Sequence, residues 1–121
     1  MSQSAKSVYY FGFYLVLLGL TLILQPNLLL STFGIPETSE VWIRVAGMLV
    51  LALSVYYIVV SKNDITVFLK VTVFVRSCII FFFVAFTFAG LVQPVIILFG
   101  AVDLLGAAWT YTALKKEGKL G

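Results

Sequence analysis

Arg76 and Asp103 are the residues with the most distinctive chemistry, because each lies inside a long apolar run that is otherwise almost free of charge. A charged side chain at the centre of a bilayer costs on the order of 3 kcal/mol on insertion scales, so such residues usually pair, face a protein interior or line a pathway. One hypothesis is an Arg76–Asp103 ion pair that fixes helix register. The second is that Arg76 holds an anionic head group or substrate while Asp103 carries a proton. The remaining possibility is that the two side chains never meet.

Depth within the apolar runs makes the ion pair the first-choice contact. Asp103 lies near the middle of the last run, and Arg76 lies about five residues, or ~7 Å, from the middle of the run before it. An arginine side chain can bridge that gap.

Other polar residues extend the candidate ligand or ion-pair site. Thr72 and Thr87 share a helical stripe with Arg76, and Thr110 shares one with Asp103. Arg44 lies nearer the end of its run, where it either reaches water, pairs with Glu40 one turn earlier or joins the site.

The elements that must position these residues are transmembrane helices. The chain is 62% hydrophobic and 11% charged, with a mean hydropathy of +1.12, which is typical of an integral membrane protein. Four apolar runs, at about 8–24, 42–60, 71–92 and 95–114, each approach the ~20 residues that span a bilayer, and none alternates as a barrel strand does. We predict an all-α protein with one domain, residues 1–121, folded as a four-transmembrane-helix bundle.

Basic residues set the expected topology. In a four-span arrangement every lysine falls on one side, which predicts a multi-pass protein of the bacterial inner membrane with both termini cytoplasmic (N-in/C-in). The first run lacks a cleavage site and is expected to remain as a helix. The net charge of +3 is then a topology signal, and no nucleic-acid partner is expected. The lysines are Lys6, Lys62, Lys70, Lys115, Lys116 and Lys119.

The connecting segments carry turn and cap signals. Pro26 is suited to open a short interfacial helix, and Thr38 or Ser39 is suited to cap the second span. The short link 90–94 predicts that the third and fourth spans are antiparallel neighbours. Gln25-Pro26 and Gln93-Pro94 occupy equivalent places, so a parallel repeat of two helical hairpins is an open hypothesis beside chance similarity.

Small and aromatic residues recur at helical spacing. Small side chains let transmembrane helices approach closely, so these positions predict helix packing, and the stripes on the first two spans are also candidates for a homo-oligomer interface. The packing candidates are Gly12, Gly19, Gly47, Ser54, Gly100 and Gly106. Aromatics near the span ends are expected to be interface anchors. They are Tyr9, Tyr10, Trp42, Tyr56, Tyr57, Trp109 and Tyr111.

The inventory disfavours enzymes. Cys78 is the single cysteine and histidine is absent, so no intrachain disulfide, His-based triad or common zinc site is expected, and no cofactor or metal is predicted. One intramembrane acid leaves few acid–base candidates, and no catalytic residue is assigned.

Three segments together resemble a known family. Arg44-Val-Ala-Gly47, Arg76 and Phe99-Gly-Ala-Val-Asp103 are similar to the small bacterial DoxX-like four-helix membrane proteins. Some members are linked to redox partners or act as assembly factors, so the resemblance implies an accessory or ligand-binding role and no particular catalytic residue.

Two function classes remain. In the favoured one, the bundle holds a lipid-like, quinone-like or other amphipathic ligand, or the helix of a membrane-protein partner, around Arg76 and Asp103. In the alternative, several copies form a proton- or ion-coupled transporter or channel with Asp103 as the ion site.

Overall fold

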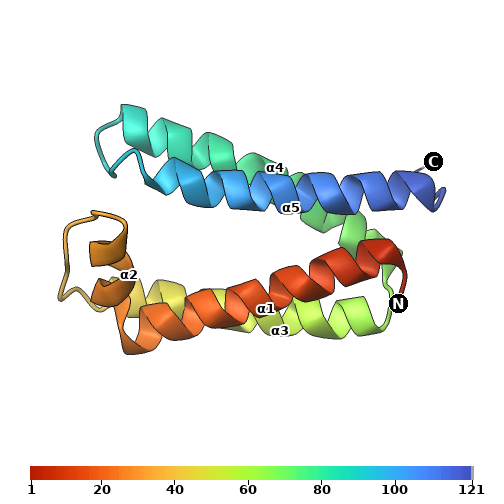
Figure 1. Cartoon of the computed structure of the whole chain (residues 1–121), viewed down its shortest axis with the longest axis horizontal. Helices are drawn as coiled ribbons and strands as arrows, with labels where there is room; N and C mark the ends of the chain where they lie inside the picture. The colour runs from red at the N-terminus through yellow and green to blue at the C-terminus, as the bar shows by residue number, and fades with distance from the viewer. Residues whose placement is uncertain (121) are drawn as a thin grey trace.

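Five α-helices make up the fold in residues 1–120, the part of the chain that the computed structural model describes (Figure 1). They are α1 (Gln3–Leu24), α2 (Pro26–Thr32), α3 (Trp42–Lys62), α4 (Thr66–Phe88) and α5 (Ile96–Lys116). All except α2 are long and apolar enough to cross a membrane. The all-α architecture with four membrane-length helices is therefore confirmed, as is the short helix that begins at Pro26.

Each long helix has an end that differs from its predicted span, and the differences are largest for α1 and α4. α1 begins near residue 3 because the Ser2 hydroxyl accepts a hydrogen bond from the Ala5 N–H at 3.1 Å, which caps the helix. α4 lies about four or five residues earlier than the run 71–92 and ends before Gly90, whose φ of +73° breaks the helix. For α3 the predicted caps are wrong. Val41 precedes the helix without a side-chain cap, and the Thr38 hydroxyl accepts instead from the Glu40 N–H at 3.0 Å.

The long helices form two hairpins that run in the same direction. α1 packs against α3 and α4 packs against α5, which confirms that the last two spans are neighbours. Both hairpins start and finish at the end of the bundle that carries the two chain termini, here called the terminal end, and turn at the opposite end, here called the α2 end (Figure 1). The shared orientation suits the repeat hypothesis. However, α2 has no helical counterpart in residues 89–95.

Glycines bring α1 and α3 into backbone contact. A Cβ atom at Gly19 would lie 2.9 Å from the Gly47 carbonyl oxygen, and one at Gly47 would lie 2.7 Å from Leu22 Cβ. At Gly12 a Cβ would lie 2.9 Å from Ile58, and Ser54 on the facing helix is fully buried. These small residues therefore face the neighbouring helix of the same chain, as a packing role requires. Whether copies of the chain associate stays a prediction.

The other two packing glycines serve α5. At Gly100 a Cβ would lie 2.9 Å from Ile80 Cα, so this glycine sets the approach of α5 to α4. At Gly106 it would lie 2.9 Å from the Phe11 ring and 3.0 Å from Arg76 Nη1. Gly106 therefore makes room for the side chains of the candidate site.

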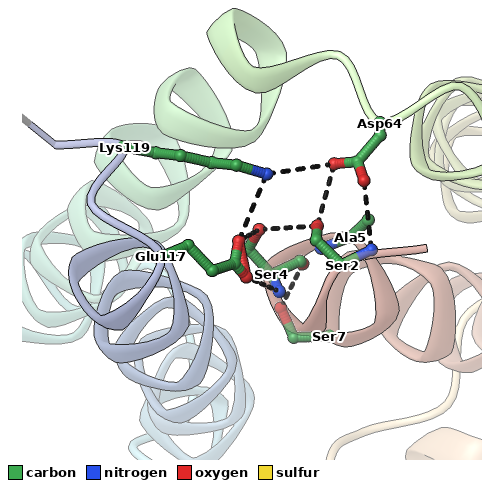
Figure 2. Close-up of polar contacts among 7 residues, drawn as sticks. All are labelled: Ser2, Ser4, Ala5, Ser7, Asp64, Glu117 and Lys119. Carbon is green, nitrogen blue, oxygen red and sulfur yellow. Dashed lines mark hydrogen bonds and ion pairs between the residues drawn. The ribbon is translucent and has the colours of Figure 1, made fainter.

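A cluster of polar residues closes the terminal end (Figure 2). The Asp64 carboxylate accepts from the Ser2 N–H at 3.0 Å and from its hydroxyl at 2.8 Å. Glu117 accepts in the same way from Ser4, at 3.0 and 2.6 Å. Lys119 Nζ lies 3.5 Å from Asp64 and 3.3 Å from Glu117. These five residues, here called the terminal clasp, tie the start of α1 to the α3–α4 loop and to the segment after α5.

The carboxylates of the terminal clasp are stabilised in their charged form. Partial burial alone would raise their pKa values, but the hydrogen bonds from Ser2 and the proximity of Lys119 outweigh it and lower the pKa of Asp64. The pKa of Glu117 is lowered in the same way by Ser4 and Lys119, and the pKa of Lys119 is raised by the two carboxylates. The negative charge of these two carboxylates near the start of α1 also interacts favourably with the positive end of the helix dipole.

The hairpins are joined mainly near the terminal end. The buried core lies there, and α1 meets α5 in this half, whereas α1 with α4 and α3 with α4 make few contacts. In Figure 1 the two pairs diverge towards the α2 end. The core residues are Ala5, Val8, Phe11, Leu15, Tyr57, Leu69 and Leu114.

Candidate functional site

A cavity of about 380 Å³ lies between the two hairpins and is lined by residues of all five helices. Its polar side chains are Tyr14, Tyr57, Arg76 and Asp103, and the rest of the lining is aliphatic or phenylalanine. Leu29, Ile35 and Phe99 are among the apolar residues at the α2 end. The cavity is thus an apolar chamber with a small polar region at the side nearer the terminal end.

Arg76 is buried, with 1% of its surface exposed, and is held by two threonines. Its Nε donates to the Thr72 carbonyl oxygen at 3.2 Å, and its Nη2 donates to Thr72 Oγ1 at 3.2 Å and to Thr110 Oγ1 at 2.8 Å. Nη1 is buried and has no hydrogen-bond partner within residues 1–120. A buried guanidinium N–H without a partner is costly, so this atom marks a place where a ligand acceptor would be stabilised.

Two aromatic rings hold the guanidinium group from α1 and α3. Arg76 Cζ lies 4.9 Å from the centroid of the Phe11 ring and 5.9 Å from that of Tyr57, which is within the range of cation–π attraction. Tyr57 is only 4% exposed, so its predicted role as an interface anchor is wrong.

A chain of hydroxyl groups links Arg76 to the terminal end. Thr110 Oγ1 lies 2.6 Å from Ser7 Oγ, and the Ser7 hydroxyl also reaches the Ser4 carbonyl oxygen at 2.6 Å. Ser7 and Thr110 are buried. The network therefore joins α1, α4 and α5, and it fixes Arg76 relative to the terminal clasp.

The expected ion pair is not formed. No nitrogen of Arg76 lies within 4.0 Å of an Asp103 oxygen, and Asp103 has no ion-pair partner within residues 1–120. Nevertheless, both side chains line the same cavity. Arg76 and Asp103 thus face the same cavity without contacting each other.

Helix position and side-chain direction explain this separation. Because α4 spans residues 66–88, Arg76 lies one residue from its middle, whereas Asp103 lies about three residues, or ~4.5 Å, from the middle of α5 towards the α2 end. Long side chains on a helix lean towards its N-terminus. The two helices are antiparallel, so Arg76 leans towards Thr110 at the terminal end while Asp103 leans the other way.

Of the remaining predicted residues, Thr72 and Thr110 meet at Arg76, but Thr87 and Arg44 do not. The Thr87 hydroxyl donates to the Phe83 carbonyl oxygen of its own helix at 2.8 Å. Arg44 is exposed, and its Nη1 donates to the Ile23 carbonyl oxygen in the last turn of α1, so the alternative pairing with Glu40 is wrong. A carbonyl in the last turn of a helix lacks an intrahelical donor, which makes it an effective partner for arginine.

Three site residues on α1 were not singled out from the sequence. Ser7, Phe11 and Tyr14 lie at positions i, i+4 and i+7, and therefore on one face of the helix. That spacing was a usable signal. Its polar first member ends the mostly polar segment 2–7 and lies just before the predicted run 8–24, so it was not grouped with that run.

The site contains no group of metal-binding residues. Within residues 1–120 no three His, Cys, Asp or Glu side chains gather where they could hold a metal ion. The site offers a guanidinium, a carboxylate and two phenol groups, which can bind polar atoms of a ligand beside an apolar chamber. Comparisons of the chain with protein-family models, with curated proteins and with solved structures found no match.

Proposed function

We propose that this protein is a multi-pass membrane protein that binds a lipid-like amphipathic molecule in the cavity between its hairpins, in an accessory role without catalysis. One observation carries the proposal. The buried Arg76 Nη1 has no protein partner and belongs to a side chain that lines a largely apolar cavity of about 380 Å³.

The size and lining of the cavity suit such a ligand. Ligand sites are typically concave, mostly apolar and supplied with a few placed polar groups, at volumes from about 300 Å³ upward. Counting ~30 Å³ for each water- or methylene-sized group, the cavity holds about a dozen such groups. A polar head and roughly half of a long alkyl or isoprenoid chain would fill it, so both lipid-like and quinone-like ligands fit by size.

The same arrangement supports access from the bilayer. α3 and α4 both line the cavity but make few contacts with each other. The lysines lie at the terminal end or in the loop there, and by the positive-inside tendency this supports an orientation with both termini in the cytoplasm and the α2 end at the outer surface. The accessory role that the DoxX-like resemblance implies would then be to present the ligand to a membrane-protein partner.

Native mass spectrometry of the protein in nanodiscs made from its own membrane tests the proposal. We expect one chain with one retained amphipathic molecule. Ala46→Phe adds a phenyl ring at a cavity-lining position. The ring would take up about half of the space for a ligand, so this variant should no longer retain the amphipathic molecule.

Leu49→Phe is the matched control, because Leu49 is on the same helix, is 60% exposed and does not line the cavity. Equal retention by both variants would contradict binding in the cavity. An empty complex of several copies would instead favour the oligomeric transporter.

A further inference from the structure

We infer that the ligand is a single-chain amphiphile with an uncharged, hydroxyl-bearing head, and that this head bridges Arg76 and Asp103 while the chain lies towards α2. The inference rests on the proposed function and names the chemistry that the same site selects.

The charges of the site argue for an uncharged head. Arg76 and Asp103 bring one positive and one negative charge to the same cavity, and no other charged residue lines it. An anionic or cationic head would leave an unbalanced charge in a medium of low dielectric constant, where that imbalance is expensive. A neutral head keeps the balance.

The hydrogen-bonding capacity of the site argues for a hydroxyl group. Arg76 Nη1 can only donate, and it has no acceptor within residues 1–120. An ionised Asp103 can only accept, and it lies beyond the reach of a direct ion pair. A hydroxyl oxygen accepts from the guanidinium while its hydrogen is donated to the carboxylate, whereas a group that only accepts satisfies one side.

The position of the polar region supports both points. Arg76 is one residue from the middle of α4, so a head in this site lies near the centre of the bilayer. The apolar lining continues from there towards the α2 end, where Leu29 and Leu30 of α2 and Ile96 and Phe99 of α5 line the cavity. The head must therefore cross hydrocarbon to reach Arg76, which costs far less for a hydroxyl group than for an ion.

A competition among three probes with the same decyl chain tests the inference. The probes are decyl glycerol ether, decyl sulfate and decyltrimethylammonium, whose charges do not change with pH. They are added in equal amounts to the full-length protein in nanodiscs, and retained molecules are identified by native mass spectrometry. We expect the glycerol ether to exceed each charged probe by about tenfold or more, as an unbalanced charge near the site requires.

In the Asp103→Asn variant decyl sulfate should be retained most. The substitution leaves the charge of Arg76 unbalanced, and decyl sulfate restores neutrality. Glu40→Gln makes the same change of net charge at an exposed loop residue and should keep the original order. Arg76→Gln should shift retention towards decyltrimethylammonium. This variant tests the same charge balance independently if Asp103→Asn does not fold.

The outcomes separate this inference from the proposed function. Retention of all three probes at similar levels, blocked by Ala46→Phe, would overturn the inferred head chemistry and leave cavity binding intact. Preference of the unmodified protein for decyl sulfate would overturn it as well. Retention of none of the probes would overturn both.

Discussion

Thr110→Val removes the hydroxyl group on which the buried polar network depends, while it nearly preserves side-chain shape. Thr110 Oγ1 accepts from Arg76 Nη2 at 2.8 Å and lies 2.6 Å from Ser7 Oγ. The substitution therefore leaves a second guanidinium nitrogen without its interhelical partner. It also removes the link between α1 and α5.

The expected cost follows from those two contacts. A hydrogen bond to a charged group contributes about 1.5–3 kcal/mol, and interhelical hydrogen bonds measured in a membrane protein average about 0.6 kcal/mol. Arg76 keeps its contacts with Thr72, so the lower part of the first range applies. We expect a loss of about 2 kcal/mol in the free energy of unfolding, which is roughly a thirtyfold change in the folded-to-unfolded ratio.

Unfolding in mixed micelles with increasing denaturing detergent measures this loss. Trp109 stacks on Tyr10 of α1, with ring centroids 6.3 Å apart, so its fluorescence reports separation of α1 from α5. A Trp42→Phe background isolates that signal, since the chain has two tryptophans. Thr112→Val is the matched control, because the exposed Thr112 hydroxyl bonds only to the Trp109 carbonyl oxygen of its own helix.

The control should change stability by less than about 0.5 kcal/mol. Equal losses for Thr110→Val and Thr112→Val would refute the assignment of Thr110 as the partner of Arg76.

Three further results are expected. Asp103→Asn should cost about 1 kcal/mol in the same titration, less than Thr110→Val, because it removes the charge that balances Arg76 across the cavity but breaks no direct ion pair within residues 1–120; a loss larger than that of Thr110→Val would restore the direct ion pair. Gly47→Ala should cost about 1–3 kcal/mol by overpacking against Leu22 Cβ, 2.7 Å from the added atom, and no change would show that α1 and α3 can separate freely. Stability should fall on acidification below about pH 4, since the lowered pKa values of Asp64 and Glu117 give a contribution that is present above their unfolded values and lost as the pH falls through the folded ones; an Asp64→Asn, Glu117→Gln double variant should lose this acid sensitivity, measured by the same titration at pH 3–7.

The four long helices could be predicted from hydropathy, because an α-helix satisfies its backbone hydrogen bonds within one apolar segment. Helix ends were harder. The start of α1 depends on a cap at Ser2, and the five residues before the third apolar run are helical although Lys70 interrupts their hydropathy. Hydropathy reports what a segment contacts, whereas a helix end is set by local hydrogen bonds and backbone angles.

The residues of the site could be predicted from the sequence better than the contacts between them. Arg76, Asp103, Thr72 and Thr110 were recognisable because polar residues inside apolar helices are expensive. Their pairing was not, because the opposite lean of side chains on antiparallel helices decides whether arginine meets aspartate or threonine. Tyr57 illustrates the same limit. Its position along the span predicts a place near a membrane interface, whereas the rotation of α3 turns its side chain towards Arg76.

Photo-crosslinking tests ligand binding between the hairpins most directly. A decyl glycerol ether with a diazirine on its chain is irradiated with the protein in nanodiscs, and the labelled residues are mapped by peptide mass spectrometry. We predict labels on cavity-lining residues such as Leu30, Val50 and Phe99, with loss of these labels when unmodified glycerol ether is added in excess. Labels confined to the exposed residues Leu17, Phe74 and Leu105, and insensitive to the competitor, would contradict the account.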